Sequence, residues 1–222
     1  AEVKKTVLEL GGSDPAVILA DADLDFAARS CAASRLINSG QSCIAPTRIL
    51  VQKDRAQEAA TFVKAMFEGT SVGDPMQEGM HIGPVVNKAQ YEKIQGLIQS
   101  AIDEGATLET GGTDRPADLN RGYYIKPTVF SGVPQNMRIA KVEVFGPVAT
   151  IMAYDDLDQA IEIANDTEYG LSAVVSGDPA KAAEVAPKLR AGMVAINNWG
   201  PNPGAPFGGY KQSGNGREAG LF

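Results

Sequence analysis

Short apolar runs, bounded by glycine, proline or aspartate, recur through the first half of the chain and predict strands. The segments between several of them place apolar residues three or four positions apart, which is typical of a helix with one buried face. Strands are expected at residues 6–10, 16–19, 48–52 and 106–109.

Polar residues mark where the expected helices begin and end. One helix follows residues 21–23, where Asp21 and Asp23 offer an N-cap and early negative charge, and it ends near the turn-forming residues 38–40. A second is capped by Asp54, and a third covers residues 87–104. The expected buried faces are Ala59, Ala60, Val63, Met66 and Phe67 in the second helix and Ile94, Leu97, Ile98, Ala101 and Ile102 in the third.

The second half of the chain repeats strand and helix. Strands are expected at 123–130, 148–154, 171–176 and 193–197, and helices at 155–165 and 179–189. Pro127 places the first of these strands at a sheet edge, and Pro187 kinks its helix or ends it early. Strands that alternate with helices predict an α/β fold, a three-layer domain with a largely parallel sheet flanked by helices.

Composition narrows the class of protein. The 222 residues fit one large domain or two small ones, no linker divides them, and 44% apolar residues supply a sizeable core. A net charge of -7 without a basic stripe argues against a nucleic-acid partner, but it is compatible with a nucleotide cofactor held by backbone amides. Since no apolar run approaches the ~18 residues of a membrane-spanning helix, no membrane partner is expected.

The chain has two cysteines and one histidine, which limits its chemistry. Cys31 and Cys43 give no disulfide framework, and this favours a reducing, cytoplasmic location. A histidine metal cluster or a Ser-His-Asp triad would depend on His81 alone, so no metal site is expected.

Cys43 lies in a loop of small, turn-forming residues between an expected helix and an expected strand. Ser39 and Gly40 allow the backbone to turn sharply there. A thiol at such a turn is open to a substrate, whereas Cys31 shares a helix face with alanines and is expected in the core. Taken alone, this loop is also compatible with a cysteine that acts only as a small hydrophobic residue.

Two glutamates are candidates for acid–base or cofactor chemistry. Glu9 precedes a glycine pair, and it is either a residue on the polar face of a strand or a general base whose pKa is raised by burial. Glu143 is either an ordinary loop carboxylate or the acceptor of two ribose hydroxyls, with Phe145 beside a flat ring. Residues 206–218 are rich in glycine but lack the order of a phosphate-binding P-loop, and Lys211 within them is expected to be solvated.

In their order along the chain, four segments resemble the catalytic half of the NAD(P)-dependent aldehyde dehydrogenase superfamily. They are Leu-Glu-Leu-Gly-Gly at 8–12, Gly-Gln-Ser-Cys at 40–43, Glu-Val-Phe-Gly-Pro at 143–147 and the glycine-rich stretch at 206–218. Cys43 follows Glu9 by 34 positions (43 − 9). The resemblance covers essentially the whole chain, and the cysteine–glutamate pair is its most specific part.

The resemblance implies the oxidation of an aldehyde to a carboxylic acid. Cys43 would attack the carbonyl and, after hydride transfer to NAD or NADP, carry a thioester. Glu9 would activate the water that hydrolyses this thioester. A glutamate at this position also favours the hydrolytic subclass over CoA-acylating relatives.

The resemblance also implies where ligands bind. Glu143, Phe145, Leu10 and Gly11 would contact the cofactor. Ile44, Trp199 and Phe207 are candidates for the substrate pocket. The partners implied are a small-molecule aldehyde and further copies of the full-length protein, as a homodimer or homotetramer.

By the same resemblance, residues 1–222 are a catalytic domain without its upstream cofactor-binding domain and its C-terminal oligomerisation strand. Weak cofactor binding and little or no turnover are therefore expected of this chain alone. Two other functions stay open. One is a cofactor-independent thiol esterase, and the other is a non-enzymatic structural protein derived from the family.

Overall fold

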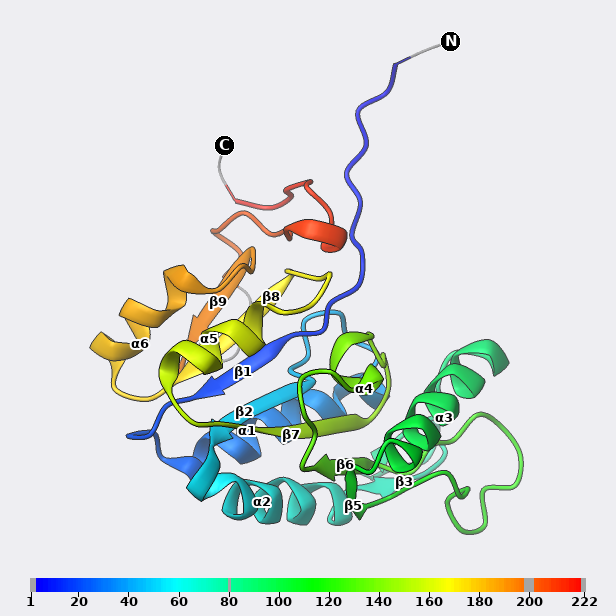
Figure 1. Cartoon of the computed structure of the whole chain (residues 1–222). Helices are drawn as coiled ribbons and strands as arrows, with labels where there is room; N and C mark the ends of the chain where they lie inside the picture. The colour runs from blue at the N-terminus through cyan, green and yellow to red at the C-terminus, as the bar shows by residue number, and fades with distance from the viewer. Residues whose placement is uncertain (1–2, 80, 198–201, 221–222) are drawn as a thin grey trace.

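A seven-stranded sheet forms the centre of the structure, a computed structural model that describes residues 3–79, 81–197 and 202–220 (Figure 1). The strand order is β5-β6-β7-β2-β1-β8-β9, and every neighbouring pair is parallel except β5 and β6. The strands are β1 (Pro15–Ile18), β2 (Arg48–Gln52), β5 (Thr107–Thr110), β6 (Thr128–Ser131), β7 (Val148–Tyr154), β8 (Ser172–Ser176) and β9 (Met193–Ile196). The predicted α/β class with a largely parallel sheet is confirmed.

Helices cover both faces of the sheet and complete three layers. One face carries α1 (Leu24–Leu36) and α2 (Ala56–Glu68), and the other carries α3 (Lys88–Asp103), α4 (Arg138–Lys141), α5 (Leu157–Asn165) and α6 (Pro179–Val185). On β1, Ile18 packs with the first group and Val17 with the second. Because both faces are covered, the central strands are mostly apolar, which is why their runs are clear in the sequence.

The starts of the helices and their buried faces agree largely with the prediction. The carboxylate of Asp23 accepts the Phe26 N–H at 3.1 Å, so it caps α1. Asp54 does not cap α2, because residues 53–55 form a short 3-10 turn and Arg55 stands directly before the helix. In α3, the predicted apolar face is buried except for Ile102, which is exposed.

Of three further expectations on strands and helices, two are wrong and one is confirmed. Residues 6–10 are not a strand, because no described strand lies beside them, and Val7 and Leu8 are exposed. The strand after Pro127 is not at an edge, since β6 lies between β5 and β7. Pro187 does end its helix early, because α6 stops at Val185 and a 3-10 turn follows.

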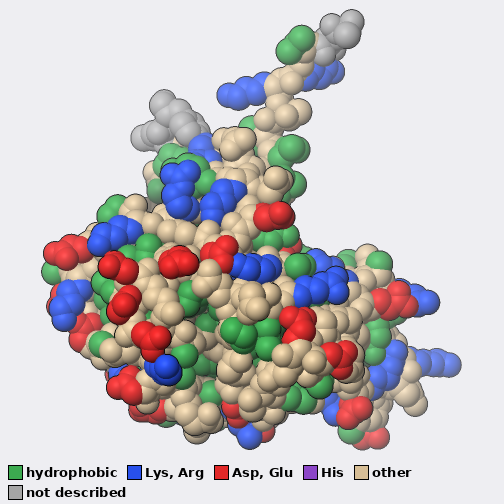
Figure 2. Space-filling model, viewed as in Figure 1, with side chains coloured by type: hydrophobic (Ala, Val, Ile, Leu, Met, Phe, Trp, Pro, Cys, Tyr) green, Lys and Arg blue, Asp and Glu red, His purple; other side chains and the backbone are tan. Residues whose placement is uncertain are grey.

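The region between α2 and α3 is mostly a loop, as predicted, but it contains a short parallel pair, β3 (Ser71–Val72) and β4 (His81–Ile82). On the face shown in Figure 2, acidic and basic side chains are interspersed. Among the helices of the described residues, none combines the length and apolar character needed to cross a bilayer.

Candidate active site

The loop that carries Cys43 begins where α1 ends. Asn38, Ser39 and Gly40 adopt left-handed backbone conformations with φ values of 51°, 56° and 74°. A Cβ atom on Gly40 would lie 2.1 Å from the carbonyl oxygen of Gly146, a contact that requires glycine. The turn predicted at Ser39 and Gly40 is therefore confirmed, and it places this loop against the loop that carries Glu143.

The pair Gly11-Gly12 lies between Cys43 and Glu143. The Gly12 N–H donates to Glu143 Oε1 at 3.0 Å. A Cβ on Gly12 would lie 2.4 Å from the Cys43 carbonyl oxygen, and one on Gly11 would lie 2.4 Å from Glu143 Oε2. Three of the four segments recognised in the sequence thus meet through closely packed backbone.

The glycine-rich segment packs along residues 7–11, although the two are far apart in the sequence (Figure 1). Ser213 Oγ donates to the Gly11 carbonyl at 2.6 Å. A Cβ on Gly214 would lie 2.8 Å from the Leu8 carbonyl oxygen. Phe207 exchanges two backbone hydrogen bonds with Glu218, of 2.7 and 2.9 Å.

Glu9 lies within residues 7–11, beside the glycine-rich segment, and its side chain is largely exposed. A hydrogen bond with the Glu218 carboxyl raises the pKa of Glu9, and burial and the charge of Glu218 raise it further. The sequence pointed to burial as the cause. The structure corrects this, because the neighbouring carboxyl group has the larger effect.

The two cysteines differ in accessibility. Partial burial raises the pKa of the Cys43 thiol, and the charges of Asp14, Glu9 and Glu143 raise it further. Burial raises the pKa of Cys31 to about 12. Cys31 is enclosed in the core, as predicted, whereas Cys43 is a half-exposed thiol that needs a proton acceptor to become a thiolate.

Asp14 is a site residue that sequence reasoning missed. It is buried beneath the Cys43 loop, and it accepts hydrogen bonds from Ser172 N at 3.2 Å and from Ser172 Oγ at 2.6 Å. The same hydroxyl lies 3.3 Å from the Ile44 carbonyl oxygen. Burial raises the pKa of Asp14 to about 7, although the Ser172 bonds and the charges of Arg48 and Arg35 lower it.

Replacing Asp14 by asparagine tests this carboxyl. Its folded-state pKa lies above the ~3.9 of an unfolded aspartate, so its contribution to stability is present at low pH and is lost as pH rises through about 7. Between pH 5 and pH 8, the free energy of unfolding of Asp14→Asn should therefore improve by about 3 kcal/mol relative to wild type, as measured by urea denaturation. If the difference in free energy of unfolding between variant and wild type did not change with pH, this pKa would be contradicted.

The remaining predicted residues lie at or near the same place. Ile44 and Phe145 are half-buried, and Phe145 has a left-handed φ of 52°. Leu10 is exposed and Phe207 is half-buried. Trp199 lies outside the described residues.

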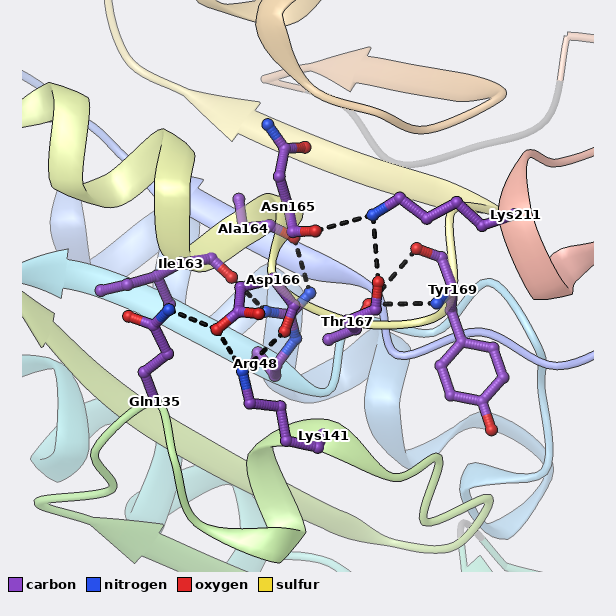
Figure 3. Close-up of polar contacts among 10 residues, drawn as sticks. All are labelled: Arg48, Gln135, Lys141, Ile163, Ala164, Asn165, Asp166, Thr167, Tyr169 and Lys211. Carbon is purple, nitrogen blue, oxygen red and sulfur yellow. Dashed lines mark hydrogen bonds and ion pairs between the residues drawn. The ribbon is translucent and has the colours of Figure 1, made fainter.

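Lys211 is not simply solvated, as Figure 3 shows. Its Nζ donates to the carbonyl oxygens of Asn165 at 2.7 Å and Thr167 at 3.0 Å, at the C-terminal end of α5. Cations are favourable at that end of a helix. Lys211 therefore anchors the glycine-rich segment to the end of α5, where Arg48 and Lys141 also donate to backbone carbonyl oxygens.

The arrangement suits nucleophilic catalysis assisted by a carboxylate. Cys43 supplies an accessible sulfur atom, and Glu9 supplies a carboxyl group with a raised pKa. Glu143 has one oxygen on the Gly12 N–H, while its second oxygen lies beside the side-chain-free Gly11. A hydroxyl-bearing ligand such as ribose fits this carboxylate as a hydrogen-bond donor.

The sequence and the structure of the chain are similar to those of known proteins. The sequence model described as "Aldehyde dehydrogenase family" matches residues 1–221. A putative aldehyde dehydrogenase of Staphylococcus saprophyticus is 46% identical over 222 residues, which are 100% of this chain and 47% of that protein. The chain therefore spans about half the length of the curated relatives it matches.

Solved structures agree with this. A mutant of aldehyde dehydrogenase C from Pseudomonas syringae, in complex with NAD+ and octanal, superimposes with a TM-score of 0.93 at 46% identity, over 96% of this chain and 44% of that one. An aldehyde dehydrogenase of Mycobacterium tuberculosis in complex with NAD+ gives a TM-score of 0.92 at 41% identity, over 96% and 44%.

Proposed function

Because the chain belongs to the aldehyde dehydrogenase family, we propose that it oxidises an aldehyde to a carboxylic acid, with Cys43 as nucleophile and Glu9 as general base. The observation that carries this proposal is the meeting of the Cys43, Gly11-Gly12 and Glu143 segments. The effect of the Glu9 charge on the pKa of the Cys43 thiol supports the pairing of these two residues.

Glu143 would hold the cofactor, and Leu10, Gly11 and Phe145 would line its site. The second carboxylate oxygen of Glu143, beside Gly11, suits a ribose hydroxyl. NAD(P)+ would supply the acceptor for the hydride of the aldehyde carbon. The NAD+ complexes of the relatives support a cofactor of this type for the present chain.

The chain's own residues would act in the following order. Cys43 Sγ, after losing its proton, bonds to the carbonyl carbon, and the Cys43 backbone N–H is a candidate donor to the oxygen. Once the carbon is oxidised, sulfur and acyl group form a thioester. Glu9 then takes a proton from water, the water oxygen bonds to the acyl carbon, and the C–S bond breaks to release the acid.

We further propose that residues 1–222 are the nucleophile-bearing half of an enzyme that also has a cofactor-binding half. The 47% coverage of the relative supports this. We call this chain joined to such a half the complete enzyme. Assembly into a homodimer or homotetramer and a cytoplasmic location belong to the same proposal, and the free thiols of Cys31 and Cys43 support the latter.

Octanal is a suitable probe, because the Pseudomonas syringae relative was solved with it. The complete enzyme should form reduced cofactor from octanal with NAD+ or NADP+, followed at 340 nm, and the 222-residue chain alone should form little. Nitrophenyl-ester hydrolysis without cofactor serves as the comparison. Ester hydrolysis without any aldehyde oxidation would favour a thiol esterase instead.

A further inference from the structure

Arg35 lies one residue before the end of α1, and its side chain is buried at 1% exposure. All five of its guanidinium N–H groups have acceptors. They donate to the carbonyl oxygen of Gly40 at 2.9 Å, to that of Ala45 at 3.2 Å, to Thr47 Oγ1 at 3.0 Å and twice to the carbonyl oxygen of Gly146. Such a set uses the planar geometry of arginine, which lysine does not share.

These acceptors lie on two separate loops. Gly40 precedes Cys43, and Ala45 and Thr47 follow it, so Arg35 holds the cysteine loop from both sides. Gly146 belongs to the other loop, three residues after Glu143. One buried side chain therefore connects the loop of the nucleophile to the loop of the cofactor carboxylate.

We propose that Arg35 is a positioning residue that fixes the Cys43 loop relative to the Glu143 loop. The meaning of these loops for catalysis rests on the proposed function. The link itself rests on the hydrogen bonds of Arg35 alone.

Two further contacts support this role. Gly40 packs directly on the Gly146 carbonyl, which is the same atom that Arg35 holds with two hydrogen bonds. The Gln90 side chain donates to the carbonyl oxygens of Val144 and Phe145, at 3.0 and 2.9 Å. The left-handed conformation of Phe145 is unfavourable for a bulky residue and needs such support from its surroundings.

Arg48 provides a matched control. It is buried at 2% exposure, like Arg35, and its pKa is likewise lowered by burial to about 10. Its side chain donates to other acceptors, however. These are the carbonyl oxygen of Ser13 at 2.9 Å and those of Ile163 at 2.6 Å and Ala164 at 2.8 Å (Figure 3). Replacing either arginine leaves a buried charge poorly bonded, so both variants should be destabilised to a similar degree.

The test compares Arg35→Lys with Arg48→Lys in the 222-residue chain. Iodoacetamide labelling is followed by mass spectrometry across pH, at a temperature where circular dichroism shows both variants folded. In Arg35→Lys the Cys43 loop should open, its burial should fall, and its thiol pKa should return toward the ordinary value. Cys43 should then label roughly ten-fold faster near pH 8, while Cys31 stays protected. In Arg48→Lys, the Cys43 rate should stay within about two-fold of wild type.

Hydrogen exchange at Gly12 gives a second measurement, since its amide bonds to Glu143. Protection of this amide should fall in Arg35→Lys relative to wild type. If Arg35→Lys does not fold, Gly40→Ala keeps the Arg35 side chain but pushes Gly40, whose carbonyl is one of its acceptors, away from Gly146, and it should give the same two changes. Equal labelling and equal exchange in a folded Arg35→Lys or Gly40→Ala variant and in wild type would overturn the proposal.

Steady-state kinetics of the complete enzyme separate this proposal from the proposed function. Arg35→Lys should lower kcat by about 10²-fold and raise the KM for NAD+, because a small displacement of reacting groups is costly. If the wild-type enzyme shows no aldehyde oxidation, the proposed function fails. The labelling experiment still tests whether Arg35 positions the Cys43 loop. If wild type is active and Arg35→Lys has wild-type kinetics, the positioning role fails alone.

Discussion

Replacing Cys43 by alanine in the complete enzyme should lower aldehyde-dependent cofactor reduction by about 10⁴-fold or more, because the reaction loses its nucleophile. The fold should be kept, since Cys43 is half-exposed and an alanine fits its turn. Absorbance at 340 nm with octanal gives the rate, and circular dichroism verifies the fold.

Cys31→Ala is the matched control for that loss. Cys31 is buried in the face of α1 that packs on the sheet, so its replacement removes packing but no chemistry. A cost of about 1–2 kcal/mol in stability is expected, with kcat unchanged within about two-fold. Equal losses of activity in the two variants would mean that the thiol of Cys43 has no special role.

Replacing Glu9 by glutamine should separate the two halves of the reaction. The thioester should still form, but the water that hydrolyses it loses its base, so the steady-state rate should fall by about 10²- to 10⁴-fold. A stopped-flow trace should therefore show a burst of reduced cofactor close to one equivalent per site, followed by a slow phase. A variant without a burst, or with a wild-type steady state, would contradict the role of Glu9.

Glu218→Gln is the companion variant for Glu9. The hydrogen bond and charge of Glu218 raise the pKa of Glu9, so their removal should lower that pKa. The acidic limb of the kcat profile should then move to lower pH, because Glu9 becomes a base at lower pH. A profile that does not move would show that Glu218 has no influence on the base in the complete enzyme.

Much of the fold could be predicted because its strands are buried on both faces. Residues 48–52 and 148–154 coincide with β2 and β7, since parallel strands covered on both faces are mostly apolar. Residues 6–10 have the same kind of pattern but no described neighbouring strand, and pattern alone does not show whether a partner exists. The position of β6 inside the sheet was likewise missed, because Pro127 precedes the strand and removes no hydrogen bond from it.

The place of the candidate site could be predicted where a motif marks it, as at Cys43 and at the glycine pair. It was not predictable where a buried side chain reaches across the fold. Asp14 meets Ser172, 158 positions away, and Arg35 meets Gly146, 111 positions away. Arg35 did leave a signal, since it follows Cys31 by four positions on the apolar face of α1, where a charged residue is unusual.

The central claim is that Cys43 carries the acyl group, and trapping that group tests it most directly. The Glu9→Gln complete enzyme is mixed with octanal and NAD+, quenched in acid during the burst, digested and examined by mass spectrometry. We expect an octanoyl group on the peptide that contains Cys43 and an unmodified peptide for Cys31. Reduced cofactor formed with an unmodified Cys43 peptide, or an acyl group on another residue, would contradict the assignment.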